Sequence, residues 1–425
     1  MSTVETGISR CPVIHGDGGE DFDYKPFQMK DPFPSYARLR EEAPVVYDER
    51  IGYYVVTRYD DIKAVFADHE TFSSENAAAP VRPYGPPAKQ IMADGGFSVY
   101  SGLSSRQPPE HTRIRAAVIK GFTPRRMRQL EPAIRERVTE LLDAMLAAPD
   151  RRGEIVAAIA RDLPTETILK HIGVDPDMVP TFKIWSDSRA AMTWGDLDDT
   201  QQIPHANNLV DYWQECQRVV QRYKGEPGEN FTSDLLRAQA EGDPITDHEI
   251  ASVLYSLLFA GHETTTTLIA NTLRVLLPAR AQWEGLVADP SGIPAAVEEV
   301  LRYSGSIVAW RRRATRDAEI AGKVIPKGGD ILVVMGSANR DTTHFDDPDE
   351  FLVGRPNVRE HLSFGFGIHT CIGAPLARLQ VKVVLEELVR RVPSLRAVDP
   401  ESIEFRENLS FRVPTAVPVA WDEVR

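Results

Sequence analysis

Cysteine is scarce in this sequence. The 425 residues include three cysteines, Cys11, Cys216 and Cys371. An odd number of widely spaced cysteines excludes a disulfide framework, and three thiols are too few for an iron–sulfur cluster, which takes about four. Cys11 with His15 supplies too few ligands for a metal site. Cys216 falls in a predicted helix and is expected to be a small apolar residue of the core.

Positive charge and long apolar runs are also missing. The net charge of −13 disfavours nucleic-acid binding, because phosphate contacts need a basic surface. No stretch approaches the roughly 20 apolar residues of a membrane helix. Residues 1–17 lack the charged and then apolar pattern of a secretion signal. We therefore expect a cytoplasmic protein that binds neither nucleic acid nor membrane.

The pattern of apolar residues predicts a mainly α-helical protein with a small β-sheet region. Residues 52–57 are rich in β-branched and aromatic residues, which predicts a strand, and helical periodicity follows over residues 60–68. Helical patterns return over residues 111–146 and dominate to about residue 303. A last long helix is predicted over residues 374–392.

Three segments depart from this helical pattern. Residues 75–108 are rich in Ala, Pro and Gly and show no period, which predicts a long loop of the kind that is usually functional or disordered. Residues 318–334 predict a hairpin or small sheet around a turn from Pro326 to Asp330. We expect residues 1–20 to be a disordered tail and residues 21–425 to form a single domain.

The strongest chemical signal is the string Phe364-Gly365-Phe366-Gly367-Ile368-His369-Thr370-Cys371-Ile372-Gly373. Glycines let a backbone turn with positive φ and approach a flat ligand closely. A cysteine just before a helix gains from the free N–H groups of the helix N-terminus, which stabilise a thiolate. A thiolate on haem iron favours cleavage of the O–O bond. The alternative is a Gly-rich turn with a buried free cysteine.

A second signal lies in the middle of a long predicted helix. Thr246 to Glu249 forms a capping box at its start, and Pro278 ends it. Gly261 costs about 1 kcal/mol relative to Ala, and a buried Thr264 hydroxyl can bond the carbonyl of Ala260 and distort the helix. Such local cost at one place favours a functional role, although a buried helix with a packing glycine would also explain it.

With these motifs in this order, the chain resembles the cytochrome P-450 family over nearly its whole length. The resemblance implies a triangular, mostly α-helical fold around a buried haem b, with Cys371 as the axial iron ligand. Ala260 and Gly261 match the groove that holds dioxygen, and Glu263 and Thr264 match the acid and alcohol that deliver protons. Glu299 and Arg302 match a buried structural ion pair, where a surface salt bridge would be the ordinary interpretation.

The resemblance also implies which residues hold the cofactor. His111 and Arg115 lie four apart on one helix face. Together with Arg312 and His369 they match the donors to the haem propionates, although the neighbouring Arg311 and Arg313 leave the arginine open, and a surface basic cluster is the alternative. The full set of implied haem-binding residues is His111, Arg115, Ala260, Gly261, Thr264, Arg312, Phe364, Gly365, His369, Cys371 and Gly373.

The substrate pocket is expected to be apolar. By resemblance, its candidate residues are Phe97, Val99, Tyr100, Leu257, Ala260, Ile307, Val308 and Leu409. Their apolar character suits a small-to-medium hydrophobic organic ligand, although such residues could equally belong to the core. The sequence does not identify that ligand.

These features predict an oxygen-dependent monooxygenase that inserts one oxygen atom of O₂ into its substrate, by hydroxylation or oxidative dealkylation. A peroxide-driven enzyme is one alternative, but it would not need the intact pair Glu263 and Thr264. A non-enzymatic haem sensor is another, and it would need no large substrate pocket. Turnover of NAD(P)H with surrogate redox partners would separate the three.

Electrons are expected from outside this chain, from a ferredoxin and a ferredoxin reductase that act as separate proteins. The sequence has no cysteine cluster and no Gly-x-Gly-x-x-Gly stretch after a strand. Met192 to Gly195 and Ser304 to Arg312 resemble the haem portion of reductase-fused bacterial members, from which this chain is expected to differ in having no reductase of its own. We expect a monomer. Its acidic partner would dock on a basic patch of Arg125, Arg126, Arg128, Arg378 and Lys382.

Overall fold

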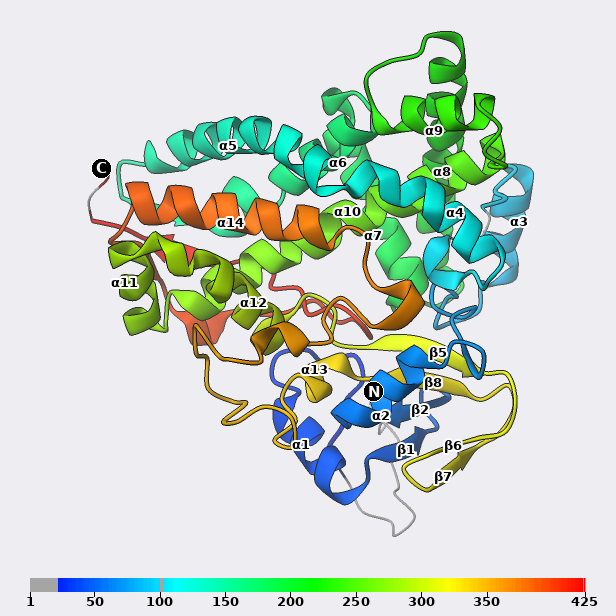
Figure 1. Ribbon diagram of the computed structural model, residues 1–425, viewed down its shortest axis with the longest axis horizontal. Coiled ribbons are helices and arrows are strands. Elements are labelled where there is room, and N and C mark those ends of the chain that lie inside the picture. Colours follow the sequence, from blue (N-terminus) through cyan, green and yellow to red (C-terminus); the bar gives the residue numbers. More distant parts are fainter. Residues whose placement is uncertain (1–21, 100–101, 423, 425) are drawn as a thin grey trace, which may run out of the picture.

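The computed structural model describes residues 22–99, 102–422 and 424, and it is mainly helical (Figure 1). The predicted tail at residues 1–20, with Cys11, lies outside the described residues, as does Tyr100. The helices are α1 (Phe33–Glu42), α2 (Tyr59–Ala67), α3 (Pro86–Asp94), α4 (Glu110–Val118), α5 (Pro124–Leu146), α6 (Leu163–Ile172), α7 (Val179–Trp194), α8 (Gln202–Gly225), α9 (Phe231–Ala240), α10 (Asp247–Leu276), α11 (Arg280–Ala288), α12 (Ile293–Ser304), α13 (Met335–Ala338) and α14 (Ala374–Arg391).

The strands form three small sheets beside the helical part (Figure 1). A five-stranded sheet has the order β1-β2-β8-β5-β3, in which β2 and β8 run parallel and the other pairs are antiparallel. The strands are β1 (Val45–Asp48), β2 (Tyr53–Val56), β3 (Phe72–Ser73), β4 (Arg152–Glu154), β5 (Trp310–Ala314), β6 (Ala318–Ile320), β7 (Lys323–Ile325), β8 (Asp330–Val333), β9 (Arg396–Ala397) and β10 (Pro418–Ala420). This arrangement confirms the expected mainly α fold with a small β region.

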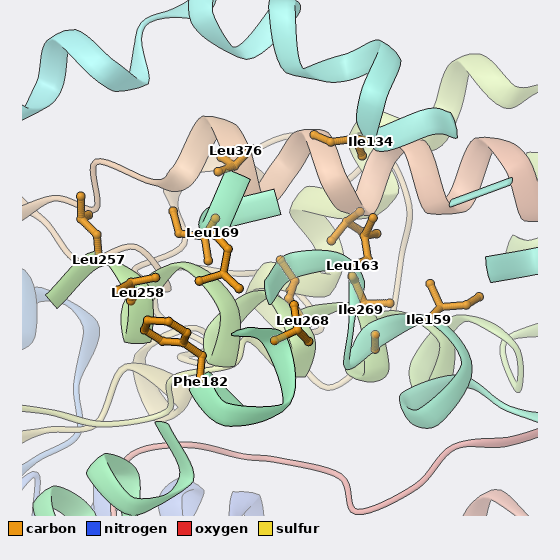
Figure 2. Packing of buried hydrophobic residues seen from close by; sticks show 14 of the residues in the cluster. Ile134, Ile159, Leu163, Leu169, Phe182, Leu257, Leu258, Leu268, Ile269 and Leu376 are labelled. Carbon is orange, nitrogen blue, oxygen red and sulfur yellow. The ribbon is translucent and has the colours of Figure 1, made fainter. Parts of the chain in front are cut away.

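Helix α10 runs through the centre of the helical part and packs against α6, α8, α12 and α14. Its capping box is present as predicted, with the Thr246 side chain accepting from the Glu249 backbone and the Glu249 side chain accepting from the Thr246 backbone. Figure 2 shows its apolar side chains packed with those of neighbouring helices. Full burial of one such side chain stabilises the fold by about 1.5–3 kcal/mol. Within the described residues, no helix is long and apolar enough to cross a membrane.

Two of the predicted segments differ from the structure. Residues 75–108 are not one loop, because α3 lies within them and begins at Pro86 and Pro87. Its two buried residues, Ala88 and Met92, lie one turn apart, and two residues are too few to show a helical period. The predicted hairpin turns at Ala321 and Gly322, both with positive φ, and joins β6 to β7. The strand after the Pro326 turn is β8, which pairs with β2 and β5 instead.

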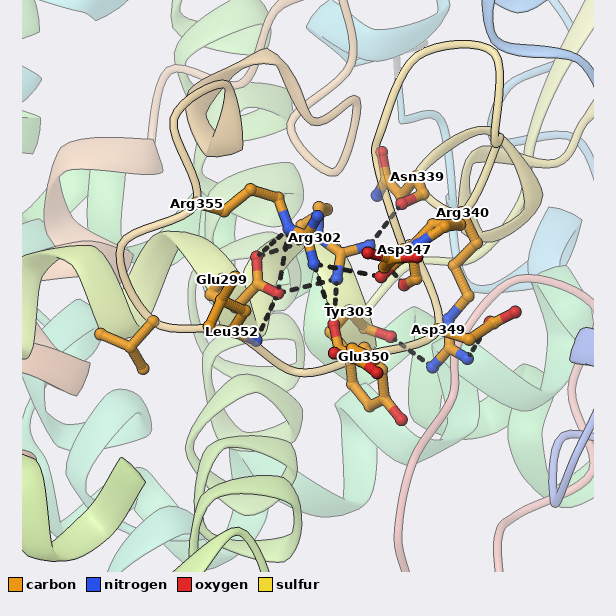
Figure 3. A network of polar contacts seen from close by, with 12 residues as sticks. Glu299, Arg302, Tyr303, Asn339, Arg340, Asp347, Asp349, Glu350, Leu352 and Arg355 are labelled. Carbon is orange, nitrogen blue, oxygen red and sulfur yellow. Dashed lines mark hydrogen bonds and ion pairs between the residues drawn. The ribbon is translucent and has the colours of Figure 1, made fainter. Parts of the chain in front are cut away.

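The predicted pair of Glu299 and Arg302 is fully buried and anchors the segment that leads to the cysteine loop (Figure 3). The Arg302 guanidinium donates to both Glu299 oxygens, at 2.9 and 2.7 Å, and to the carbonyls of Asn339, Pro348 and Glu350. Arg355 lies 3.4 Å from the same carboxylate. These bonds tie α12 to residues 339–355, a stretch with little regular structure of its own.

Candidate functional site

The predicted functional residues gather around one cavity between the middle of α10 and the loop that precedes α14. Apolar and aromatic side chains supply most of its wall. Among the described residues, no acidic side chain lines it, and its charged lining groups are Arg115, Arg189 and Arg312. Residues from both predicted motifs line it, namely Ala260, Thr264, Phe364, Gly365, Phe366, His369, Thr370, Cys371 and Ile372.

The loop from Phe364 to Gly373 presents Cys371 to this cavity. Gly365 and Gly367 have φ values of +70° and +74°, which L side chains rarely adopt, and a Cβ on Gly367 would come within 2.7 Å of the Phe66 carbonyl. The Cys371 N–H donates to the Phe364 carbonyl at 2.9 Å and closes the turn. Burial within the protein raises the pKa of the Cys371 thiol, while the N–H groups of Gly373 and Ala374 and the charge of Arg115 act to lower it.

The buried Glu298 and His361, together with the partly exposed Arg378, support this loop. Arg378 donates to both Glu298 oxygens, at 2.6 and 2.9 Å, and its guanidinium lies 4.6 Å from the centroid of the Phe364 ring. His361 Nδ1 accepts the Ser363 N–H at 3.2 Å, so Nε2 carries the proton and faces Glu298 at 3.2 Å. Burial alone would raise the pKa of Glu298, but these two donors outweigh it and hold the pKa at about 2.

The basic side chains Arg115, Arg312 and His369 line the cavity, and His111 packs beside His369. Arg115 donates to the Thr370 carbonyl at 2.7 Å, and in the described part of the chain neither Arg115 nor Arg312 forms an ion pair. His111 is 2% exposed, has no hydrogen-bond partner for either ring nitrogen, and lies 4.4 Å from the His369 ring. Burial lowers the pKa of His111 to about 4 and that of His369 to about 3.

This donor set fits a haem. The cavity places a thiol opposite a helix groove, glycines where a flat group would approach, and unpaired cations where two carboxylates would sit. Arg115, Arg312, His369 and His111 would hold the propionates, and Cys371 would hold the iron.

The alternation of side chains along β5 shows which of the three neighbouring arginines faces the cavity. Successive side chains of a strand point to opposite faces. Arg311 donates to the carbonyls of Ala77 and Ala79, and Arg313 pairs with Asp330 and Glu75. Arg312 alone of the three lines the cavity, where burial lowers its pKa to about 10.

On α10 the structure separates residues that are adjacent in sequence. Thr264 lines the cavity and donates to the Ala260 carbonyl at 2.7 Å, as expected, and Ser306 donates to the Thr264 carbonyl at 2.6 Å. Glu263 faces a second cavity, where Arg406 Nη1 lies 3.9 Å from Glu263 and 3.0 Å from Asp187. Gly261 does not line the main cavity, because a Cβ there would come within 2.7 Å of Ile168 on α6. Its contact is helix packing, contrary to the expected place at the cofactor.

The candidate substrate residues divide in the same way. Leu257, Ala260 and Ile307 line the cavity. Phe97 packs edge-on against Tyr255 at 5.9 Å, and Val99 packs against the main core. Val308 and Leu409 are 2% and 1% exposed and belong to the core rather than to the lining.

Sequence reasoning missed most of the wall that faces Cys371. Its members are Arg189, Trp194, Val253, Ser256, Phe259, Trp310 and Phe411. A signal for one of them was present, because Arg189 lies four residues after Trp185 and seven after Phe182, on the buried face of α7. A lone arginine on an apolar helix face is unusual.

The predicted basic patch is largely neutralised. Arg126 pairs with Asp234, Arg378 with Glu298, and Lys382 with Glu386 at 2.9 Å. Arg125 and Arg128, on the first turns of α5, are exposed and form no ion pair with the described residues. The patch that remains for a partner is therefore smaller than expected.

Comparisons with known proteins agree with this geometry. The profile of the family described as Cytochrome P450 matches residues 293–415. The chain is 35% identical over 432 residues to Cytochrome P450 monooxygenase PikC of Streptomyces venezuelae, covering 99% of this chain and 97% of that one.

The solved structures that the chain resembles belong to the same family. The structure of cytochrome P450 CREJ in complex with (4-ethylphenyl) dihydrogen phosphate is 62% identical, with a TM-score of 0.93, and covers 94% of this chain and 100% of that one. An intact type IV self-sufficient cytochrome P450 monooxygenase is 36% identical with a TM-score of 0.89, and this chain covers 53% of it. The chain belongs to the cytochrome P450 family, whose members are haem-thiolate monooxygenases.

Proposed function

We propose that this enzyme oxidises a para-alkylated aryl phosphate, with Cys371 as the axial ligand of haem b. One atom of O₂ enters a C–H bond of the alkyl group, the other leaves as water, and the reaction consumes two electrons and two protons. The haem supplies the oxygen activation when bound. The observation that carries the proposal is the placement of Cys371 across one cavity from Thr264.

Thr264 and Glu263 are assigned the delivery of protons. The Thr264 hydroxyl faces the side of the cavity where oxygen would react, which is where a proton is needed. Glu263 faces the second cavity and a half-exposed pair of Arg406 and Asp187, so it can exchange protons with water there.

The substrate class rests on the shape and chemistry of the wall. Trp194, Phe259, Trp310 and Phe411 form a packed aromatic cluster that lines the cavity, with the ring centroid of Trp194 at 5.2, 6.0 and 4.9 Å from the other three. An aromatic wall of this kind suits contact with the ring of an aromatic substrate. The complex of CREJ, at 62% identity, contains an aryl phosphate with a para-ethyl group.

Electrons are assigned to a separate ferredoxin and its reductase. The three cysteines of the sequence cannot hold an iron–sulfur cluster. The exposed Arg125 and Arg128 lie on α5, which packs along α14, the helix that follows Cys371.

Two measurements test the proposal. The reduced, CO-bound protein is expected to show the red-shifted Soret band of a thiolate-ligated haem, and Cys371→His is expected to abolish it. With a surrogate ferredoxin, its reductase and NADPH, 4-ethylphenyl phosphate is expected to give a product heavier by one oxygen. A thiolate band that survives in Cys371→His would overturn the ligand, and the absence of product would overturn the substrate class.

A further inference from the structure

One charged side chain of the cavity has no part in holding the haem or in moving protons. Arg115 and Arg312 are assigned to the haem propionates, whereas Arg189 comes from α7 and its guanidinium lies over Tyr255 and Phe259 of α10. Among residues 22–99, 102–422 and 424, no carboxylate pairs with Arg189, and no acidic side chain lines the cavity at all. An unpaired cation in a largely apolar wall is costly unless an anion occupies the site.

Aromatic side chains fix the position of this guanidinium. Its Cζ lies 4.4 Å from the centroid of the Tyr255 ring and 4.9 Å from that of Phe259, and Nη1 donates to the Tyr255 carbonyl at 2.5 Å. Stacking on ring faces suits a guanidinium, and the N–H groups that do not bond the Tyr255 carbonyl can donate to an anion. The positive charge of Arg189 also acts to lower the pKa of Tyr84, Tyr212 and Tyr255, which burial raises. The charge of Arg189 therefore acts on several tyrosine side chains, and no carboxylate of the described residues neutralises it by an ion pair.

A second donor of the same wall also lacks a partner. The Trp194 side chain is 2% exposed and lines the cavity, and its Nε1 has no hydrogen-bond acceptor in the described structure. Buried indole N–H groups usually find an acceptor. Trp194 Nε1 is covered by the surrounding protein atoms, so the unpaired charge of Arg189 is the feature of this wall that indicates an anionic ligand.

The spacing along α10 places this anion site at the right distance from the reacting end. Tyr255 and Phe259, which flank Arg189, lie nine and five residues before Thr264, or roughly 8–13 Å along the helix axis. A ring with substituents at its two para positions is of this order in length. An anion at Arg189 would therefore point the opposite substituent at Ala260 and Thr264.

We propose that Arg189 is the receptor for the phosphate of the substrate and makes the enzyme selective for aryl phosphates over the free phenols. This inference rests on the substrate class proposed above. The guanidinium binds the phosphate oxygens through charge-assisted hydrogen bonds, and the aromatic cluster contacts the ring. Phosphate binding then fixes which end of the molecule faces the oxygen, so Arg189 determines both affinity and the position of oxidation.

The test compares two ligands that differ only in the phosphate, 4-ethylphenyl phosphate and 4-ethylphenol. Each is titrated into the ferric haem protein, and the shift of the Soret band gives its Kd without turnover. The wild type is expected to bind the phosphate at least 10-fold more tightly than the phenol. Arg189→Gln is expected to weaken the phosphate about 10- to 100-fold, since it removes a charge-assisted pair of hydrogen bonds, and to change the phenol less than about 3-fold.

Two further variants serve as controls for the result with Arg189→Gln. Arg189→Lys keeps the charge but loses the fork, and its phosphate affinity is expected between those of the wild type and Arg189→Gln. Arg82→Gln removes the same charge from an exposed residue paired with Asp196, outside the cavity, and is expected to bind both ligands as the wild type does.

Three results would contradict the assignment of Arg189 as the phosphate receptor. They are a wild type without preference for the phosphate, an Arg189→Gln variant with unchanged phosphate affinity, and a variant in which both ligands weaken equally, which would show a structural role. None of these affects the thiolate spectrum. Failure of the proposed haem ligation would instead appear in the CO spectrum of the wild type, where Arg189 has no influence.

Discussion

The two walls of the cavity are built in different ways. The wall that carries Cys371 is built mainly from one continuous stretch of chain, which is closed by backbone hydrogen bonds. It is supported by the buried pair Glu299–Arg302 and by the buried Glu298, which pairs with the partly exposed Arg378. The wall that faces it is assembled from separate elements, namely α7, α10, β5 and residues near the C-terminus, and α10 contributes the most side chains. Replacing Glu298, Glu299 or Arg302 behind the first wall leaves a charged partner without its countercharge, whereas the side chains of the second wall can be exchanged separately. The chemistry is therefore fixed by the first wall and the choice of substrate by the second.

The largest effect is expected from breaking the support of the cysteine wall. Glu299→Ala leaves Arg302 and Arg355 buried without their carboxylate, which is expected to cost about 3–5 kcal/mol of unfolding free energy and to release haem. Urea unfolding and haem absorbance measure both. Glu284→Ala serves as the control, because its pair with Arg280 is exposed and is worth less than about 1 kcal/mol. Equal losses in the two variants would contradict a supporting role for the buried network.

A change on the opposite wall is expected to affect turnover and spare the fold. Thr264→Ala removes the hydroxyl that faces the cavity, so product formed per NADPH is expected to fall about 10-fold or more, with hydrogen peroxide released instead. The control is Thr272→Ala, which removes a hydroxyl with the same 2.7 Å bond to a carbonyl four residues back, away from the cavity. An unchanged product yield in Thr264→Ala would exclude its role in proton delivery.

The contrast between the walls also explains what the sequence could predict. Features that lie within a few consecutive residues were predictable, because their spacing in the sequence determines their geometry. The structure has three of them where the sequence predicted, namely Cys371, the capping box at Thr246 and the pair Glu299–Arg302. Choosing Arg312 from three neighbours needed the pairing of β5, because only the register decides which face each side chain takes. Gly261 was misjudged since its neighbour, Ile168, is distant in sequence.

The facing wall was beyond such reasoning for a related reason. Arg189, Trp194 and Phe411 meet only after α7, α10 and the C-terminal segment have packed. Apolar residues such as Val308 and Leu409 look identical in sequence whether they line a cavity or fill a core, and here they fill the core. Helix α3 was hidden because a helix of nine residues shows too little of a period.

A smaller effect on the cysteine wall is expected to depend on pH. The folded pKa of Glu298 is about 2, below its ordinary value of 4.5, so its charge adds stability that is present above pH 4.5 and is lost as the pH falls towards 2. Glu298→Gln is expected to cost about 1–3 kcal/mol at neutral pH, with the difference from the wild type shrinking over this acid range. Unfolding free energies across that range check the sign. A difference that stays constant down to the lowest pH would show that Glu298 is not the group that titrates.

The smallest effect is expected for variants at the surface behind the cysteine wall. These residues do not line the cavity, so they act only on the electrostatic attraction of the redox partner. A chain of net charge −13 repels an acidic ferredoxin unless a local basic patch receives it, and Arg125 and Arg128 are the exposed cations of α5 without an ion pair in the described structure. Arg125→Glu with Arg128→Glu is expected to slow electron transfer from an acidic ferredoxin about 3- to 10-fold at low ionic strength, and the difference should vanish as salt screens the charges. The control, Lys89→Glu with Lys327→Glu, changes the net charge equally at exposed residues of α3 and of the turn before β8. If the two double variants slow the transfer equally, net charge alone governs the encounter and α5 is not the docking surface; if neither slows it at any ionic strength, the partner does not approach by electrostatic steering.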